Sequence, residues 1–168
     1  MYTDMERFKE IYKHTLKWEG GDKLHNVSGD SGGWTKYGIS YNNNKQHFKS
    51  LDDFKNMTFE KASEIAYKNY YLPLDLGIVN PKVQAMLFDI AFNMGVKRAV
   101  ILAQRALGLV DDGIIGKNTR ANLHLLDKVK LNNERVKYFN SIVKNNPTQS
   151  KFLKGWLNRS EYFLKTDI

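Results

Sequence analysis

Glu19 and Asp30 are two carboxylates whose surroundings in the sequence fit the hydrolysis of a glycosidic bond. Glu19 ends an amphipathic run and is followed at once by Gly20 and Gly21. Two glycines after a helix let the chain enter conformations that residues with a Cβ avoid, which predicts a carboxylate at the edge of a cleft. Glycosidic hydrolysis uses one acid to protonate the leaving oxygen and a second carboxylate to activate water or stabilise the charged sugar. We interpret Glu19 as the acid.

The second carboxylate has two candidates. Asp30 opens the run Asp30-Ser31-Gly32-Gly33, so it fits a general base or an electrostatic stabiliser, but also a turn former that accepts backbone N–H bonds. Asp22 is closer to Glu19 in the sequence and is a rival for the same role. The separation of the two carboxylates decides whether a glycosidase inverts or retains the anomeric configuration, so both outcomes stay open here.

Length and composition limit the kinds of site that the chain can build. Its 168 residues are the size of one domain and can bury a core without disulfides. The chain has no cysteine, which excludes disulfides, zinc-thiolate sites and thiol nucleophiles. Its four histidines are scattered, without a pair at metal-ligand spacing. The sequence therefore predicts no metal and no cofactor.

The balance of charges favours a polyanionic partner. Lys and Arg total 26 against 18 Asp and Glu, a net charge of +8. The basic residues are spread along the chain and no nucleic-acid-binding motif appears, so we expect an anionic cell wall rather than nucleic acid. The first residues lack the pattern of a signal peptide, and no run approaches the ~18 apolar residues of a membrane helix. We therefore expect synthesis in the cytoplasm and no stable membrane insertion.

The periodic spacing of apolar residues predicts a mainly α protein with a small β-hairpin element. One helix should run from Met5 to Glu19, with Glu19 in its last turn, and Trp34 to Tyr41 should form a hairpin arm. Thr58 and Asn80-Pro81 are typical helix starts, and Gly108 is a typical helix end. Further helices are expected at Ala99–Leu107, Lys117–Leu126, Leu131–Lys144 and Gln149–Leu164.

Domain organisation follows from the weak seam around Leu72 to Asn80. No repeat, low-complexity tract or linker interrupts the chain. We expect a single domain, 1–168, with a catalytic N-terminal lobe, 1–78, and a helical lobe, 79–168.

Several motifs together carry a family resemblance. The chain resembles glycoside hydrolase family 108, a group of bacterial and phage muramidases with a lysozyme-like, mainly helical fold, followed by the predicted peptidoglycan-binding region paired with it. The similarity spans nearly the whole chain, although Ser31 stands where many members have proline. It rests on Trp18-Glu19-Gly20-Gly21, Asp30 to Ile39, Phe88 to Gly95, Gln104 to Gly108, Asp112 to Thr119, and Phe152 to Arg159.

The resemblance implies hydrolysis of the β-1,4 bond between N-acetylmuramic acid and N-acetylglucosamine in peptidoglycan, with Glu19 as catalytic acid. Thr35 resembles the threonine that holds the attacking water in phage-type lysozymes, although a β-branched residue also suits a strand. Trp34 and Tyr37 are placed to stack on sugar rings, and Asp89 and Asn93 to bind acetamido groups. For each of these four residues, burial in the core is the alternative reading, and we prefer it for Trp156.

A metal-independent, monomeric muramidase is the leading hypothesis, acting on peptidoglycan glycan strands in the periplasm or cell wall. As a phage endolysin, it would leave the cytoplasm through a separate holin-type pore. One alternative is a non-catalytic wall-binding or secretion-assisting protein. Another is a chitinase or a lytic transglycosylase on the same fold, the latter leaving a 1,6-anhydro product. The sequence leaves open whether the gene is of phage or bacterial origin.

Overall fold

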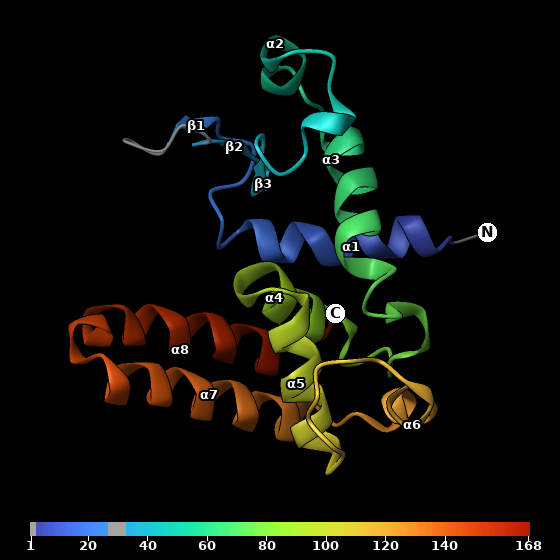
Figure 1. Cartoon of the computed structure of the whole chain (residues 1–168), viewed down its shortest axis with the longest axis vertical. Coiled ribbons are helices and arrows are strands. Elements are labelled where there is room, and N and C mark those ends of the chain that lie inside the picture. Colours follow the sequence, from blue (N-terminus) through green and yellow to red (C-terminus); the bar gives the residue numbers. More distant parts are fainter. Residues whose placement is uncertain (1–2, 27–32) are drawn as a thin grey trace. The chain divides into compact units, whose positions relative to one another are not determined.

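The computed structural model describes residues 3–26 and 33–168, which fall into two compact units (Figure 1). The first ends at Tyr71 and the second runs from Leu72 to Ile168. The boundary predicted from the sequence, between residues 78 and 79, lies seven residues after the boundary between these units. The catalytic role of the first lobe and the wall-binding role of the second stay predictions. Each unit is described by itself.

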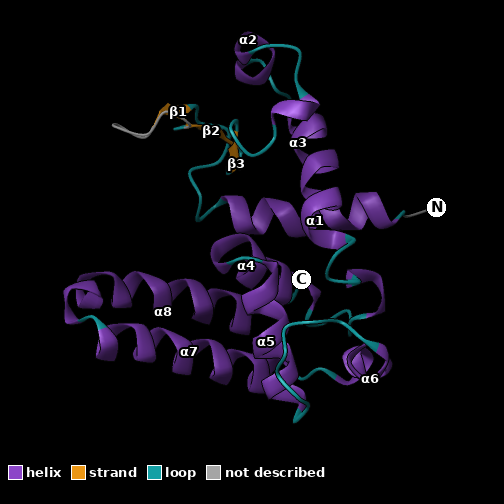
Figure 2. Cartoon of the chain, viewed as in Figure 1, coloured by secondary structure: helices purple, strands orange, loops and turns teal. Residues whose placement is uncertain are grey.

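The first unit combines a three-stranded antiparallel sheet with helices (Figure 2). The strand order is β1-β2-β3, and the register places Thr35 opposite both His25 and Ser40. Helix α1 starts from a capping box, in which Thr3 and Glu6 satisfy each other's backbone N–H groups. The elements are α1 (Asp4–Leu16), β1 (His25–Asn26), β2 (Trp34–Lys36), β3 (Ile39–Ser40), η1 (Lys45–His47), α2 (Leu51–Lys55), α3 (Phe59–Ala66) and the π-helical turn η2 (Tyr67–Tyr71).

Aromatic rings form the core of this unit where α1 packs against α3 and η2. Phe8 is fully buried and meets Tyr67 and Tyr71 edge to face, each at 5.7 Å between ring centroids. Tyr12 is also fully buried and stacks on Phe59 at 5.6 Å. These contacts fix the last turns of α1, which lead to Glu19.

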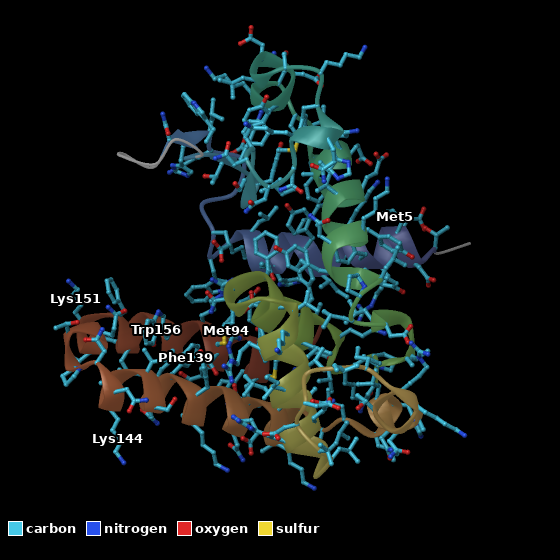
Figure 3. The ribbon with its side chains drawn as sticks, viewed as in Figure 1. Met5, Met94, Phe139, Lys144, Lys151 and Trp156 are labelled. Carbon is cyan, nitrogen blue, oxygen red and sulfur yellow. The ribbon has the colours of Figure 1, made fainter. Side chains whose placement is uncertain are left out.

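The second unit is all helical in its described elements, and α4 is its centre (Figure 1). Residues 84–91 of α4 are all buried, and the helix packs against α5, α7 and α8. Trp156 of α8 is half-buried and stacks on Phe139 of α7 at 5.3 Å (Figure 3). The elements are η3 (Leu76–Ile78), α4 (Gln84–Met94), α5 (Val96–Leu107), α6 (Lys117–Asn122), η4 (Leu123–Leu125), α7 (Lys128–Asn145), η5 (Pro147–Gln149) and α8 (Ser150–Lys165).

The predicted class, mainly α with a small β element, is confirmed, and the local differences have physical reasons. Helix α1 ends at Leu16, because the backbone turns at Lys17 to Asp22 instead of continuing the helix to Glu19. Tyr37 lies in the turn between β2 and β3 at φ 52°, not in a strand. Strand β1 and helix α2 were not predicted, because elements of two and five residues show no periodicity.

Candidate active site

Glu19 lies in a tight turn that follows α1. Its N–H donates to Leu16 O at 3.1 Å, and the N–H of Gly21 donates to the same oxygen at 3.0 Å. Gly20 and Gly21 have φ angles of 84° and 64°, the left-handed region that the glycine pair predicted. The side chain of Glu19 is half-buried. The turn therefore holds Glu19 three residues beyond the end of α1 and leaves its side chain partly open to solvent.

Two tyrosines lie within electrostatic reach of the Glu19 carboxylate. Burial raises the pKa of Tyr12 well above its usual value, with the Glu19 charge as a smaller contributor. Burial and then the Glu19 charge also raise the pKa of Tyr70, which the π-helical turn η2 carries. The Tyr12 hydroxyl donates to the backbone oxygen of Tyr37 at 2.5 Å. Both phenols are therefore protonated at neutral pH.

Thr35 is connected to the Glu19 turn through His25. Directly opposite residues of an antiparallel pair project to the same face, so Thr35 and His25 are neighbours on the sheet. The Nε2 atom of His25 lies 3.2 Å from the position that a Cβ on Gly20 would occupy. The His25 ring therefore lies between Thr35 on the sheet and Gly20, the residue after Glu19.

His25 was missed by the reasoning from sequence. A two-residue strand gives no alternation to read, and the register that brings His25 to Thr35 is a property of the folded sheet. The only available signal was the position of this histidine between the two motifs of the site.

The second carboxylate is described for one of its two candidates. Asp30 lies outside the described residues, so its placement adds nothing to the choice. Asp22 is exposed in the turn after Glu19. Burial raises the pKa of Tyr37, and the charge of Asp22 is a smaller contributor to the rise. Asp30 and Asp22 therefore both remain candidates for the second carboxylate.

The predicted sugar platforms Trp34 and Tyr37 are both half-buried. The Nζ atom of Lys55 lies 4.2 Å from the centroid of the Trp34 ring, so a cation already covers one ring face. The Tyr37 ring is tilted against Phe59 at 6.0 Å. A sugar stacking on Trp34 must therefore use the other face or displace Lys55.

Asp89 requires a correction, because the structure uses its carboxylate within the core. Asp89 is fully buried, with Oδ2 accepting from Arg135 at 2.7 Å and Oδ1 accepting from Arg159 at 2.8 Å. A carboxylate held by two buried guanidinium groups is not presented to a sugar. Asn93, one turn further along α4, is exposed and keeps its predicted availability. On this helix, Asn93 alone stays a predicted ligand for acetamido groups.

The described residues restrict the chemistry further. Across residues 3–26 and 33–168, no three His, Asp or Glu side chains are grouped to hold a metal ion. In the same part of the chain, no helix is long and apolar enough to cross a membrane. What the first unit does assemble is a half-buried carboxylate, two protonated phenols and a sheet face with a hydroxyl, which suits acid-assisted hydrolysis.

Comparison with known proteins identifies the family. Residues 12–95, half of the chain, match the family described as Glycosyl hydrolase 108. The chain belongs to this family. Residues 98–161 match the family described as Predicted Peptidoglycan domain. The matched segments contain every candidate site residue, from Glu19 to Asn93. Together they support a peptidoglycan hydrolase.

A solved structure extends the similarity to nearly the whole chain. The structure of Brucella abortus SagA matches with a TM-score of 0.73 and 27% sequence identity, over 94% of this chain and 91% of that one. The predicted lysozyme-like, mainly helical fold is confirmed. No curated protein sequence matches the chain.

Proposed function

We propose that this family 108 glycosidase is an N-acetylmuramidase, a lysozyme that hydrolyses the β-1,4 bond between N-acetylmuramic acid and N-acetylglucosamine. The observation that carries the proposal is the Glu19 turn, where two glycines in left-handed conformations hold one half-buried carboxyl at the end of α1. The matched peptidoglycan region supports the choice of substrate. Peptidoglycan glycan strands are thus the proposed partner.

In this mechanism Glu19 acts as the general acid. Its carboxyl proton passes to the glycosidic oxygen as the bond from that oxygen to the anomeric carbon breaks, which relieves the leaving group of negative charge. We propose that the protonated phenols of Tyr12 and Tyr70, which lie within electrostatic reach of Glu19, limit the water around its carboxyl. The product alcohol leaves with the proton, and Glu19 remains as a carboxylate.

Water completes the reaction with the help of the second carboxylate. Asp30, or alternatively Asp22, accepts one proton of the water while the water oxygen forms a bond to the anomeric carbon. Thr35, on the sheet face next to the Glu19 turn, hydrogen-bonds this water. If the water attacks directly from the face opposite Glu19, the configuration inverts. Return of a proton to Glu19 then restores the starting state.

The first experiment compares Glu19→Gln with a matched control, Glu10→Gln, which makes the same change on the exposed face of α1. Purified peptidoglycan is digested, turbidity is followed and the soluble products are identified by mass spectrometry. We expect Glu19→Gln to lose about 10² to 10⁴ in rate, the contribution typical of general acid catalysis, and Glu10→Gln to match the wild type. Equal activity of the two variants would sink the assignment of Glu19.

The products separate the alternative activities. Hydrated reducing ends at muramic acid support the muramidase, whereas 1,6-anhydro ends identify a lytic transglycosylase. Cleavage of chitin oligomers in preference to peptidoglycan identifies a chitinase. Binding to the wall without release of fragments identifies a non-catalytic wall-binding or secretion-assisting protein.

A second comparison assigns the base. Asp30→Asn and Asp22→Asn are measured on the same substrate, together with the anomeric configuration of the first product by NMR. The variant with the larger fall in kcat marks the second carboxylate, and an inverted first product supports a water held by Thr35. A retained configuration contradicts that arrangement.

We further propose that the enzyme is a monomeric, bacteriolytic phage endolysin that reaches the wall through a holin-type pore. The family and the net charge of +8, which suits an anionic wall, support this setting. Expression in a bacterial host with and without a co-expressed holin checks it. Lysis that depends on the holin supports the proposal, and lysis without it contradicts the export route.

A further inference from the structure

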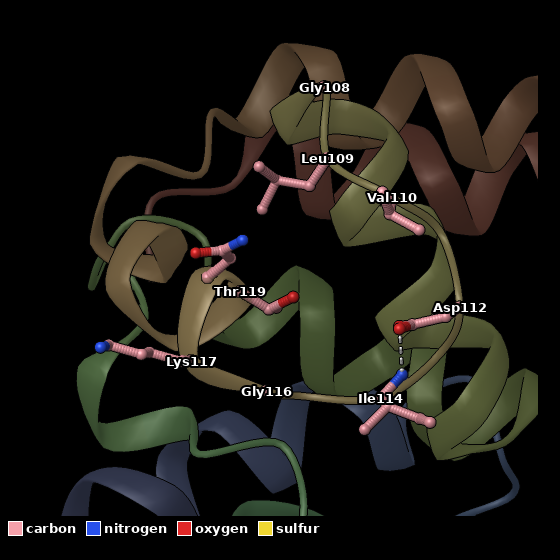
Figure 4. Close-up of a pocket in the computed structure, with 9 residues that line it drawn as sticks. Gly108, Leu109, Val110, Asp112, Ile114, Gly116, Lys117 and Thr119 are labelled. Carbon is pink, nitrogen blue, oxygen red and sulfur yellow. Dashed lines mark hydrogen bonds between the residues drawn. The ribbon is translucent and has the colours of Figure 1, made fainter.

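The loop between α5 and α6 borders an open cavity of about 580 Å³ in the second unit (Figure 4). This volume lies within the usual range for small-ligand sites, ~300 to 1,000 Å³. Val110, Ile114, Lys117 and Asn118 contribute to its lining. All of these residues belong to the segment that matches the Predicted Peptidoglycan domain, and none takes part in the candidate active site.

A buried glutamine holds the loop in shape. Gln104 of α5 is 1% exposed, and its Nε2 lies 3.0 Å from each of three acceptors, Asp112 Oδ1, Ile114 O and Thr119 Oγ1. Its Oε1 accepts from the N–H of Gly113 at 2.9 Å. One side chain therefore ties the middle of the loop and Thr119 of α6 to α5, so the pocket is formed before any ligand arrives.

The turn at Asp112 adds a second constraint. Asp112 Oδ1 accepts from the N–H of Ile114 at 2.9 Å, and this bond, followed by that from Gln104, lowers the pKa of Asp112 (Figure 4). Gly113 follows at φ 76°, and a Cβ there would lie 2.9 Å from Cγ of Lys97. Oδ1 of Asp112 and the Thr119 hydroxyl are thus used by the frame itself, which leaves Oδ2 of Asp112 and the other lining groups to meet a ligand.

The groups that remain are the apolar side chains, the Lys117 ammonium, the Asn118 amide and Oδ2 of Asp112. Val110 and Ile114 are 81% and 66% exposed, unusually high for aliphatic side chains on a rigid loop. Lys117 is exposed and forms no ion pair with any residue that the structure describes. No aromatic ring lines the described cavity, so a pyranose has no platform for stacking there. The lining suits small aliphatic groups next to a carboxylate.

We propose that this cavity binds the stem peptide of peptidoglycan. A carboxylate of the peptide pairs with Lys117 Nζ, a peptide amide meets the Asn118 side chain, and alanine methyl groups lie against Val110 and Ile114. The choice of ligand rests on the proposed function, because peptidoglycan is the polymer in which such peptides are joined to the glycan strand. The loop then anchors peptide-substituted strands, while Glu19 cleaves the glycan.

The test measures peptide binding separately from catalysis. Isotope-labelled full-length protein is titrated with a synthetic stem pentapeptide, and in parallel with chitotetraose, and amide shifts are followed by NMR. We expect the pentapeptide to shift the amides of Val110, Ile114 and Lys117, and chitotetraose to leave them unchanged. Shifts of these amides with chitotetraose alone, or no shifts with the pentapeptide, would overturn the proposal.

Variants locate the charge that matters. Lys117→Glu is expected to weaken pentapeptide binding about tenfold or more, as for the loss of a charge-assisted hydrogen bond, and Lys117→Gln to have a smaller effect in the same direction. The matched control Lys154→Glu makes the same charge change at an exposed residue of α8 that does not line the cavity. Equal binding by Lys117→Glu and Lys154→Glu contradicts a role for Lys117. Both replaced lysines are exposed, so the fold should tolerate each change.

Failure of this proposal is distinguishable from failure of the proposed function. Glu19→Gln should bind the pentapeptide as well as the wild type does. Lys117→Glu should raise KM on peptide-bearing peptidoglycan and leave kcat on peptide-free glycan unchanged. If Glu19→Gln keeps hydrolytic activity, the catalytic assignment fails whatever the cavity binds. If Lys117→Glu lowers kcat on peptide-free glycan, the cavity has a different role.

Discussion

The Glu19 turn depends on two adjacent glycines that differ in their surroundings. Both have positive φ, so an alanine at either position is strained. A Cβ on Gly20 would also lie 3.2 Å from the His25 ring, whereas a Cβ on Gly21 would meet nothing within 4 Å. Comparing alanine at the two positions therefore separates the backbone strain in the turn from the contact with His25 on the sheet.

Gly20→Ala and Gly21→Ala should each lower the free energy of unfolding by about 1 to 2 kcal/mol, the cost of a left-handed non-glycine residue. Only Gly20→Ala should also move His25 and, through it, the sheet face that carries Thr35. We therefore expect a larger fall in kcat/KM for Gly20→Ala. Urea unfolding and muropeptide release measure the two effects. Equal losses of activity would show that the His25 contact is not part of the site.

Tyr12 makes the stability of the first unit sensitive to alkaline pH. Its folded pKa lies well above its usual value, mainly because of burial, whereas an unfolded tyrosine ionises near ~10. Above about pH 10 the unfolded state releases this proton and the folded state keeps it, so stability is constant below that pH and falls as the pH rises.

Tyr12→Phe tests this linkage. The variant loses the hydrogen bond to Tyr37 O and should be about 1 kcal/mol less stable at neutral pH. Because it has no proton to retain, its stability should fall less steeply between about pH 9 and pH 11. Urea unfolding across this range measures both slopes, and parallel curves would contradict the prediction.

The elements differ in how much of them the sequence could predict. Thr58 begins its helix and Gly108 ends its helix as expected, since each acts locally: Thr58 accepts from Lys61 N–H at 3.1 Å, and Gly108 adopts φ 70°. The Glu19 turn was predictable for the same reason. Strand β1 was not, because its pairing with β2 is a property of the folded sheet.

Asp89 shows why a prediction that depends on distant residues failed. From sequence alone, an acidic residue on an apolar helix is equally consistent with a ligand site and with a buried ion pair. Its partners Arg135 and Arg159 are 46 and 70 residues away, on α7 and α8. Only the fold brings them together, and in doing so it removes Asp89 from the candidate site.

This cluster connects three helices, so we expect Asp89→Asn to be strongly destabilising. Removing one partner from a buried ion cluster typically costs about 3 to 5 kcal/mol. The control Asp111→Asn breaks an exposed pair with Arg105 and should change the unfolding free energy little. Thermal and urea unfolding compare the two variants. A small effect of Asp89→Asn would contradict the structural role.

At the scale of the whole molecule, the net charge of +8 predicts how activity depends on salt. Attraction between a basic protein and an anionic wall acts over the Debye length, which shortens from about 10 Å at 0.1 M salt to about 3 Å at 1 M. The chemical step at Glu19 takes place within a half-buried turn and is screened less. Salt should therefore weaken the approach to the wall more than it slows bond cleavage.

We expect kcat/KM on walls that carry anionic polymers to fall steeply between about 0.05 M and 0.5 M salt, while kcat changes little. Peptidoglycan stripped of those polymers is the matched substrate, and its kcat/KM should fall less steeply. The slope that remains on the stripped substrate should decrease further in Lys117→Glu, because the stem carboxylates would no longer meet a cation in the cavity. Identical salt dependence on both substrates would mean that the surplus of basic residues does not direct the enzyme to the wall, and that its affinity comes from the cavity and the candidate active site alone.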